Sequence, residues 1–86
     1  MKMMNILYFA SIRENIGISS ETISCSSNID TVNDLLIFLR TKGDNYKGAF
    51  SQTDLIRVAI NNEYVGLDKK VHSADEIAFF PPMTGG

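Results

Sequence analysis

The residues most able to take part in a chemical reaction lie at the end of the chain, which finishes "PPMTGG" at residues 81–86. At the usual glycine frequency, two terminal glycines arise by chance in about 0.5% of chains. Gly85 and Gly86 carry no side chains, so they can enter a narrow channel and leave the terminal carbonyl open to attack. A free carboxylate is inert to nucleophiles, whereas its adenylate is a mixed anhydride from which sulfur or an amine can displace AMP.

The prolines before the glycines favour an extended exit from the folded body. Pro81 and Pro82 restrict the backbone, and residues 81–86 can span about 20 Å at roughly 3.3–3.6 Å per residue. This tail carries no acid, base or metal ligand of its own, so the catalytic groups must belong to partner proteins. We therefore expect a domain at residues 1–80, an extended tail at residues 81–86, and no enzyme activity in the chain alone.

Few other residues suggest chemistry. Cys25 is the only cysteine and His72 the only histidine, so an internal disulfide is excluded and nothing resembles a metal site. His72 stands among polar residues, and we interpret it as an exposed loop residue because a working histidine needs a second positioned group. We expect neither a bound metal nor a bound cofactor.

Composition limits the remaining classes. The 86 residues are 44% hydrophobic and 21% charged, with a net charge of −2, which is typical of one small globular domain and argues against nucleic-acid binding. The apolar N-terminus is interrupted by Asn5 and followed by Arg13 and Glu14 without a cleavage site, so we interpret it as a strand rather than a signal peptide. No segment is long enough to span a membrane. The expected location is the cytoplasm.

Hydrophobic periodicity predicts one helix and five strands. The helix is expected at residues 30–43, with Thr31 as N-cap, Asp34 as its capping-box partner and Gly43 as the residue that ends it. A polar connection is expected at residues 44–54. The strands are expected at residues 5–10, 21–26, 55–61, 63–66 and 77–80, and the first two would pair as a hairpin with the second near an edge.

This order, with no second amphipathic helix, requires the helix to cover a sheet. The predicted fold class is α+β, a ubiquitin-like β-grasp with a mixed sheet of about five strands and one main helix across one face. Alternation places the following residues toward the helix: Ile6, Tyr8, Ile56, Val58, Ile60, Ile77 and Phe79.

The opposite side of the predicted sheet is also apolar. It holds Leu7, Phe9, Ala59, Ala78 and Phe80, with only Asn5 and Arg57 as polar residues. No other segment is left to cover it, and an exposed apolar patch usually marks a partner surface. The alternative is that sheet twist or the 44–54 connection buries some of these side chains.

Three segments together resemble a known family. They are "LYFASIRENIG" at 7–17, "VAINNEYV" at 58–65 and "DEIAFFPPMTGG" at 75–86. The chain resembles, over essentially its whole length, the small sulfur-carrier subunit of molybdopterin synthase. The last segment is the specific one, and the other two support it.

The resemblance implies a function in molybdenum cofactor biosynthesis. An E1-like enzyme would use ATP to adenylate Gly86, and a sulfurtransferase would supply sulfur to form a C-terminal thiocarboxylate. The large synthase subunit would take the tail and pass the sulfur to cyclic pyranopterin monophosphate (precursor Z), forming the molybdopterin dithiolene. The implied assembly is a heterotetramer of two small and two large subunits.

The resemblance also assigns roles to individual positions. Gly86 would bear the adenylate and then the thiocarboxylate. The residues that would lie in the partner's channel are Pro81, Pro82, Met83, Thr84 and Gly85. The residues that would form an apolar docking patch are Phe9, Tyr64 and Phe80. Alternation had already singled out Phe9 and Phe80, whereas Tyr64 rests on the resemblance.

One position departs from the family. Ala74 stands where the family usually has glycine in a Gly-Asp-Glu turn, and alanine disfavours a positive φ there. Either the turn has another shape or some strain is accepted. We interpret Asp75 and Glu76 as turn carboxylates rather than catalytic groups.

Two alternative functions use the same tail chemistry. One is a sulfur carrier for thiamine or another sulfur-containing metabolite, although thiamine carriers are typically shorter and lack the Phe-Phe-Pro-Pro exit. The other is a ubiquitin-like modifier in which Gly86 is joined to target lysines.

Overall fold

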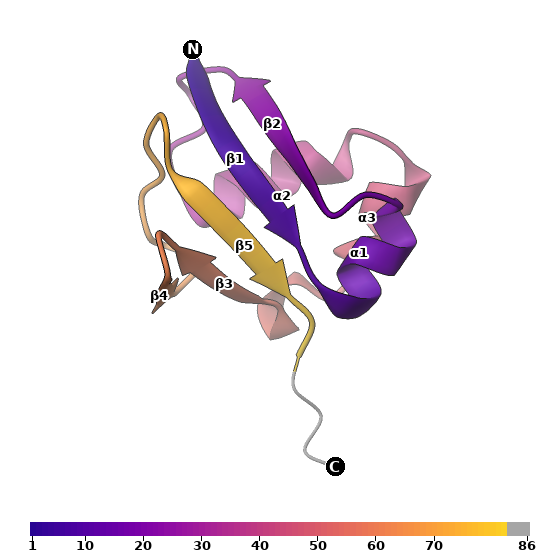
Figure 1. Cartoon of the computed structure of the whole chain (residues 1–86). Coiled ribbons are helices and arrows are strands. Elements are labelled where there is room, and N and C mark those ends of the chain that lie inside the picture. Colours follow the sequence, from indigo (N-terminus) through magenta and orange to yellow (C-terminus); the bar gives the residue numbers. More distant parts are fainter. Residues whose placement is uncertain (83–86) are drawn as a thin grey trace.

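The computed structural model describes residues 1–82 and shows a mixed five-stranded sheet (Figure 1). The strand order is β2-β1-β5-β3-β4, in which β1 and β5 are parallel and the other neighbours antiparallel. The strands are β1 (Lys2–Tyr8), β2 (Ser20–Cys25), β3 (Arg57–Ile60), β4 (Glu63–Val65) and β5 (Glu76–Phe80). The predicted hairpin of the first two strands and the edge position of β2 are both confirmed.

The helical elements are more numerous than predicted. They are α1 (Ala10–Ile16), α2 (Val32–Arg40), α3 (Asp44–Ala49) and the short 3-10 helix η1 (Thr53–Leu55). The helix α2 crosses the sheet on one face, as expected, whereas α1 and α3 lie together where β1 ends (Figure 1). The expected main helix is confirmed, but the sequence analysis missed α1 and did not predict that the 44–54 connection contains α3 and η1. Helices this short leave little periodic signal in a sequence and depend on tertiary packing.

The boundaries of α2 also differ from the prediction. The expected capping box is present: the Asp34 N–H donates to Thr31 Oγ1 at 3.2 Å, and the Thr31 N–H donates to Asp34 Oδ2 at 3.1 Å. However, α2 ends at Arg40, and Gly43 is the N-cap of α3 with an extended φ of 165°. The assignment of Gly43 as the end of the long helix was wrong because a second helix begins there.

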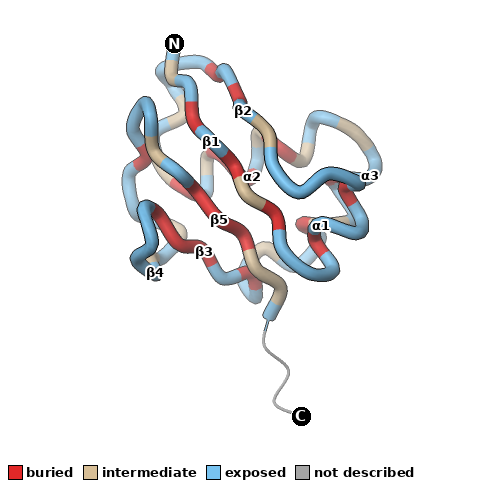
Figure 2. The backbone as a smooth tube through the Cα atoms, in the orientation of Figure 1, coloured by how far each residue is buried: buried red, intermediate tan, exposed pale blue. Residues whose placement is uncertain are grey.

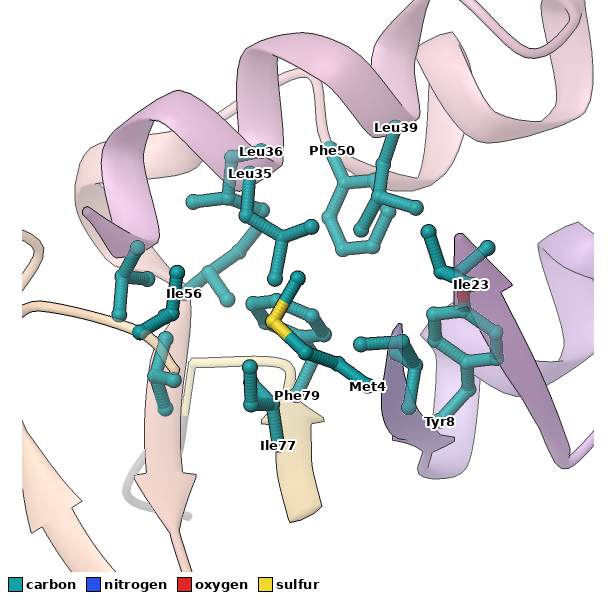
Figure 3. Packing of buried hydrophobic residues seen from close by; sticks show 14 of the residues in the cluster. Met4, Tyr8, Ile23, Leu35, Leu36, Leu39, Phe50, Ile56, Ile77 and Phe79 are labelled. Atoms are coloured by element: carbon teal, nitrogen blue, oxygen red, sulfur yellow. The ribbon is translucent and has the colours of Figure 1, made fainter. Parts of the chain in front are cut away.

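The core lies between the sheet and the helices (Figure 3). All seven residues predicted to face the helix are buried, as Figure 2 shows along β1, β3 and β5. The missed helices add Tyr46 and Ile12, and Phe50 follows α3 into the same cluster. The Phe79 ring packs against Phe50 at 5.3 Å between ring centroids. The end of β5 is therefore firmly anchored.

A hydrogen-bonded carboxylate ties α3 to the edge strand. Glu21 on β2 accepts from the Tyr8 hydroxyl at 2.7 Å and from the Tyr46 hydroxyl at 2.6 Å. Burial, helped by these bonds to Glu21, raises the pKa of Tyr46 to about 12 and raises the pKa of Tyr8 further. Both hydroxyls therefore stay protonated at neutral pH, so the link between sheet and helix is preserved.

Candidate functional site

The sheet face opposite the helices carries an uninterrupted apolar row. Cross-strand pairing aligns Leu7 with Ala78, Ala78 with Ala59, and Ala59 with Tyr64. The two alanines are small, so the row dips at its centre into a hollow of about 210 Å³ whose walls include Phe9 and Phe80. The 44–54 segment does not cover this face, because Tyr46 and Phe50 enter the core on the other face. The alternative that some of these side chains are buried is nevertheless confirmed for Ala59 and Ala78.

The three predicted docking residues lie together on this face. The Phe9 and Phe80 rings stack at 4.7 Å between centroids with a 5° interplanar angle, and Tyr64 lies 6.0 Å from Phe80. We call Phe9, Tyr64 and Phe80 the aromatic patch. Phe9 is 39% exposed and Tyr64 is 74% exposed. Phe80, between them, is half-buried. An aromatic cluster with two exposed rings suits protein binding, since such rings supply large contact areas.

Each ring is positioned by a different element. Phe9 is the N-cap residue of α1, and its N–H donates to the Phe79 carbonyl at 3.2 Å. Phe80 is the last residue of β5, and Tyr64 is the middle residue of β4. Alternation along single strands missed Tyr64, because only the pairing of β4 with β3 brings it beside Ala59.

The tail leaves the body directly beside the aromatic patch. Pro81 is half-buried and Pro82 exposed, and both follow Phe80 without an intervening turn. The exit is at the end of β5 that lies beside the end of β1 (Figure 1). Met83, Thr84, Gly85 and Gly86 lie outside the described residues, so their assigned roles stay predictions, as do the docking and channel roles of the other site residues.

The turn before β5 accepts backbone strain. Ala74 has a φ of 71°, in the left-handed region that glycine favours. The Asp75 carboxylate accepts hydrogen bonds from the His72 N–H at 2.7 Å and from Asn61 Nδ2 at 3.0 Å. These contacts give Asp75 a role in the turn, in agreement with its interpretation from the sequence.

The single cysteine and the single histidine are the side chains whose chemistry remains to be placed. Burial raises the pKa of the Cys25 thiol, which keeps it protonated and unreactive. His72 is exposed, as predicted. Within residues 1–82, no three His, Cys, Asp or Glu side chains are placed to hold a metal ion. No helix in this part of the chain is long and apolar enough to cross a membrane.

Comparison with known proteins identifies relatives along the whole chain. The ThiS family matches residues 6–86. The molybdopterin synthase sulfur carrier subunit of Haemophilus influenzae is 40% identical over 84 residues, covering 98% of this chain and 100% of that protein. The protein of the same name from Escherichia coli is 32% identical, with the same coverage.

A solved structure confirms the predicted fold. SAMP1 from Haloferax volcanii, a small archaeal modifier protein, aligns with a TM-score of 0.73 at 28% identity and covers 98% of this chain and 99% of its own. The β-grasp predicted from the order of strands and helix is therefore correct. With the family match and these relatives, the chain belongs to the ThiS family, together with the molybdopterin synthase sulfur carrier subunits.

Proposed function

We propose that this chain is the sulfur carrier subunit of molybdopterin synthase, a non-catalytic subunit that delivers sulfur on Gly86. The observation that carries the proposal is the position of the aromatic patch directly beside the exit of a Gly-Gly tail. Relatives that bear this name and match nearly the full chain support it. Docking of the patch would hold the body outside a partner while the tail enters the partner's active site.

The chemistry is confined to the terminal carboxylate. A carboxylate oxygen of Gly86 attacks the α-phosphorus of ATP, pyrophosphate leaves, and an acyl adenylate forms. A sulfur nucleophile then attacks the carbonyl carbon and AMP leaves, so a C–S bond replaces one C–O bond. The one thiol of the body, Cys25, is buried and therefore does not compete as the sulfur nucleophile.

The proposal assigns three partners. An E1-like adenylyltransferase carries out the adenylation, and a sulfurtransferase supplies the sulfur. The large subunit of the synthase accepts the tail within a heterotetramer of two small and two large subunits. There the thiocarboxylate donates sulfur to cyclic pyranopterin monophosphate to build the dithiolene. A tail that can span up to about 20 Å when extended suits delivery into a recessed site.

Mass spectrometry tests the chemical state of Gly86. When the chain is produced anaerobically with its activating enzyme, we expect a species about 16 Da heavier than the unmodified chain, because sulfur replaces oxygen. Deletion of Gly86 is expected to abolish that species. If the heavier species persists in the deletion variant, sulfur is carried elsewhere and the proposal is wrong.

A second candidate function is a ubiquitin-like protein modifier. The likeness to a small archaeal modifier protein favours it, since the same adenylated tail can acylate lysine. Covalent adducts of this chain with cellular proteins would support this function. A stable non-covalent complex with the large subunit, with no such adducts, would favour the sulfur carrier. A knockout that needs thiamine but keeps its molybdoenzymes active would instead indicate the thiazole pathway.

A further inference from the structure

A second hollow lies at the root of the tail, beside the aromatic patch. It has a volume of about 500 Å³ and runs between two helices that the sequence did not predict. We call it the α1–α3 groove. Its walls include Ser11 and Asn15 from α1, Gly48 and Ala49 from α3, and Pro81 and Pro82 from the tail.

The chemical character of the groove is neutral. Among the residues that the structure describes, none that lines it carries a charge, although 21% of the whole chain is charged. Ser11 and Asn15 stand four positions apart and thus share one face of α1. Exposed hydroxyl and amide groups beside a floor that includes the buried Ile12 and Ile56 suit an uncharged protein segment.

Gly48 is the most informative residue of the groove. A Cβ built on Gly48 would meet nothing within 4 Å, and its φ does not lie in the left-handed region. Gly43, in contrast, would bring a Cβ within 2.8 Å of Asn45 Oδ1, and Gly17 has a φ of 98°. The structure of the chain itself accounts for glycine at those two positions, by steric contact at Gly43 and by backbone conformation at Gly17. At Gly48, within α3, glycine only lowers the helix propensity. The space beside Gly48 opens outward, where another molecule can use it.

The location of the groove identifies that molecule. Pro81 and Pro82 form part of its wall, and Phe9 of the aromatic patch immediately precedes Ala10, which also lines it. The groove is therefore continuous with the aromatic patch and with the exit of the tail, so a protein that contacts both also lies against the groove.

We infer that the α1–α3 groove is a second docking surface of the large synthase subunit, which inserts an uncharged, apolar-tipped loop against Gly48. The inference rests on the proposed function, because that function supplies the partner that takes the tail. The two docking surfaces would then hold the partner on both sides of the tail exit and orient the tail as it enters.

Calorimetric titration of the full chain with the recombinant large subunit of the same organism tests the inference. Gly48→Trp fills the groove and should weaken binding by at least about tenfold. Gly48→Ala adds one methyl group, and we expect near wild-type affinity with a higher urea midpoint. Lys47→Trp is the matched control, because Lys47 is exposed and lines a different hollow, shared with Ile37.

A second substitution guards against a folding defect. Circular dichroism establishes whether Gly48→Trp is folded, and if it is not, Ser11→Arg on the facing helix replaces it in the titration. A buried unpaired charge in a neutral groove should also weaken binding at least about tenfold. If the folded variant binds as tightly as Lys47→Trp and the wild type, the inference is wrong. If the wild-type chain does not bind the large subunit, the proposed function itself fails.

Discussion

At the scale of single residues, the core and the aromatic patch are separated by one position along β5. Phe79 has no exposed surface and packs among Tyr8 and Phe50, whereas Phe80 points to the other face and stacks on Phe9. Strand alternation alone produces this division, since successive side chains leave opposite faces of a sheet. Neighbouring phenylalanines therefore offer a direct comparison of the two roles.

Truncation of Phe80 should mainly lower the affinity for the large subunit, whereas truncation of Phe79 should mainly lower the free energy of unfolding. Phe80→Ala should cost only about 0.5–1.5 kcal/mol of stability, through the lost stacking on Phe9. It should weaken binding to the large subunit about thirtyfold, or about 2 kcal/mol. Phe79→Ala should cost about 3–5 kcal/mol of stability, a large part of the ~4–13 kcal/mol expected for a chain of this size. Urea unfolding and calorimetric titration measure the two effects. Equal losses of stability in both variants would contradict the division of the strand.

Ala74 offers a gain in stability through a single substitution. Its φ of 71° strains the backbone of an L-residue by about 1–2 kcal/mol, and glycine would remove this strain. Glycine would also lower the free energy of unfolding by about 0.5–1 kcal/mol, because it gives the unfolded chain more conformational freedom. Ala74→Gly should therefore stabilise the chain by up to about 1 kcal/mol in urea unfolding. Ala49→Gly, a matched change within α3, should destabilise it. A lower unfolding midpoint for Ala74→Gly would show that the turn is not strained.

At the scale of elements, the start of α2 depends on one carboxylate. The Asp34 side chain accepts hydrogen bonds from the N–H groups of Asp30 and Thr31, at 3.1 Å each. These backbone hydrogen bonds, first that of Asp30, lower the pKa of Asp34 below its ordinary value. The charged form is therefore favoured by folding, which couples the stability of α2 to pH.

The sign of this coupling can be tested. A lowered pKa in the folded state adds stability that is complete above the unfolded pKa of about 4 and is lost as the pH falls through the lower folded value. Asp34→Asn keeps the size of the side chain and removes its charge. The variant should have a lower urea midpoint than the wild type at pH 7. This difference in urea midpoint should become smaller toward pH 3, where the Asp34 carboxylate of the wild type begins to be protonated. A gap that does not change with pH would show that charge plays no part.

At the scale of the whole molecule, the folded body presents the aromatic patch beside the exit of the tail. The patch and the exit of the tail lie at the same end, because β5 carries Phe80 and then continues as Pro81. The core residues on the other face hold this strand in place. Partners that need the terminus must therefore also approach the patch, so the molecule should serve them one at a time.

Competition between partners tests this arrangement. We expect the large subunit to inhibit adenylation by the E1-like enzyme, measured as release of pyrophosphate, with half-inhibition near the affinity of the large subunit for this chain. Phe80→Ala should require more large subunit for the same inhibition. A stable complex of all three proteins would contradict exclusive use of one face.

Much of this molecule follows from sequence patterns that act over short distances. The Gly-Gly carboxylate is a covalent property of the chain, and alternation assigns Ile77 and Phe79 to the core and Phe80 to the other face. The capping box of α2 joins residues only three positions apart, Thr31 and Asp34. Each of these features depends on residues that are close together in the chain, so a single sequence suffices to predict them.

Tertiary structure decided the rest. Tyr64 joins the aromatic patch only because β4 pairs with β3, and the short helices α1 and α3 are held by packing against each other and against the core. The α1–α3 groove exists only where these two helices meet Pro81 and Pro82. Contacts between segments distant in the chain create these features. Burial of apolar surface in the whole fold stabilises them, and no local sequence pattern specifies them.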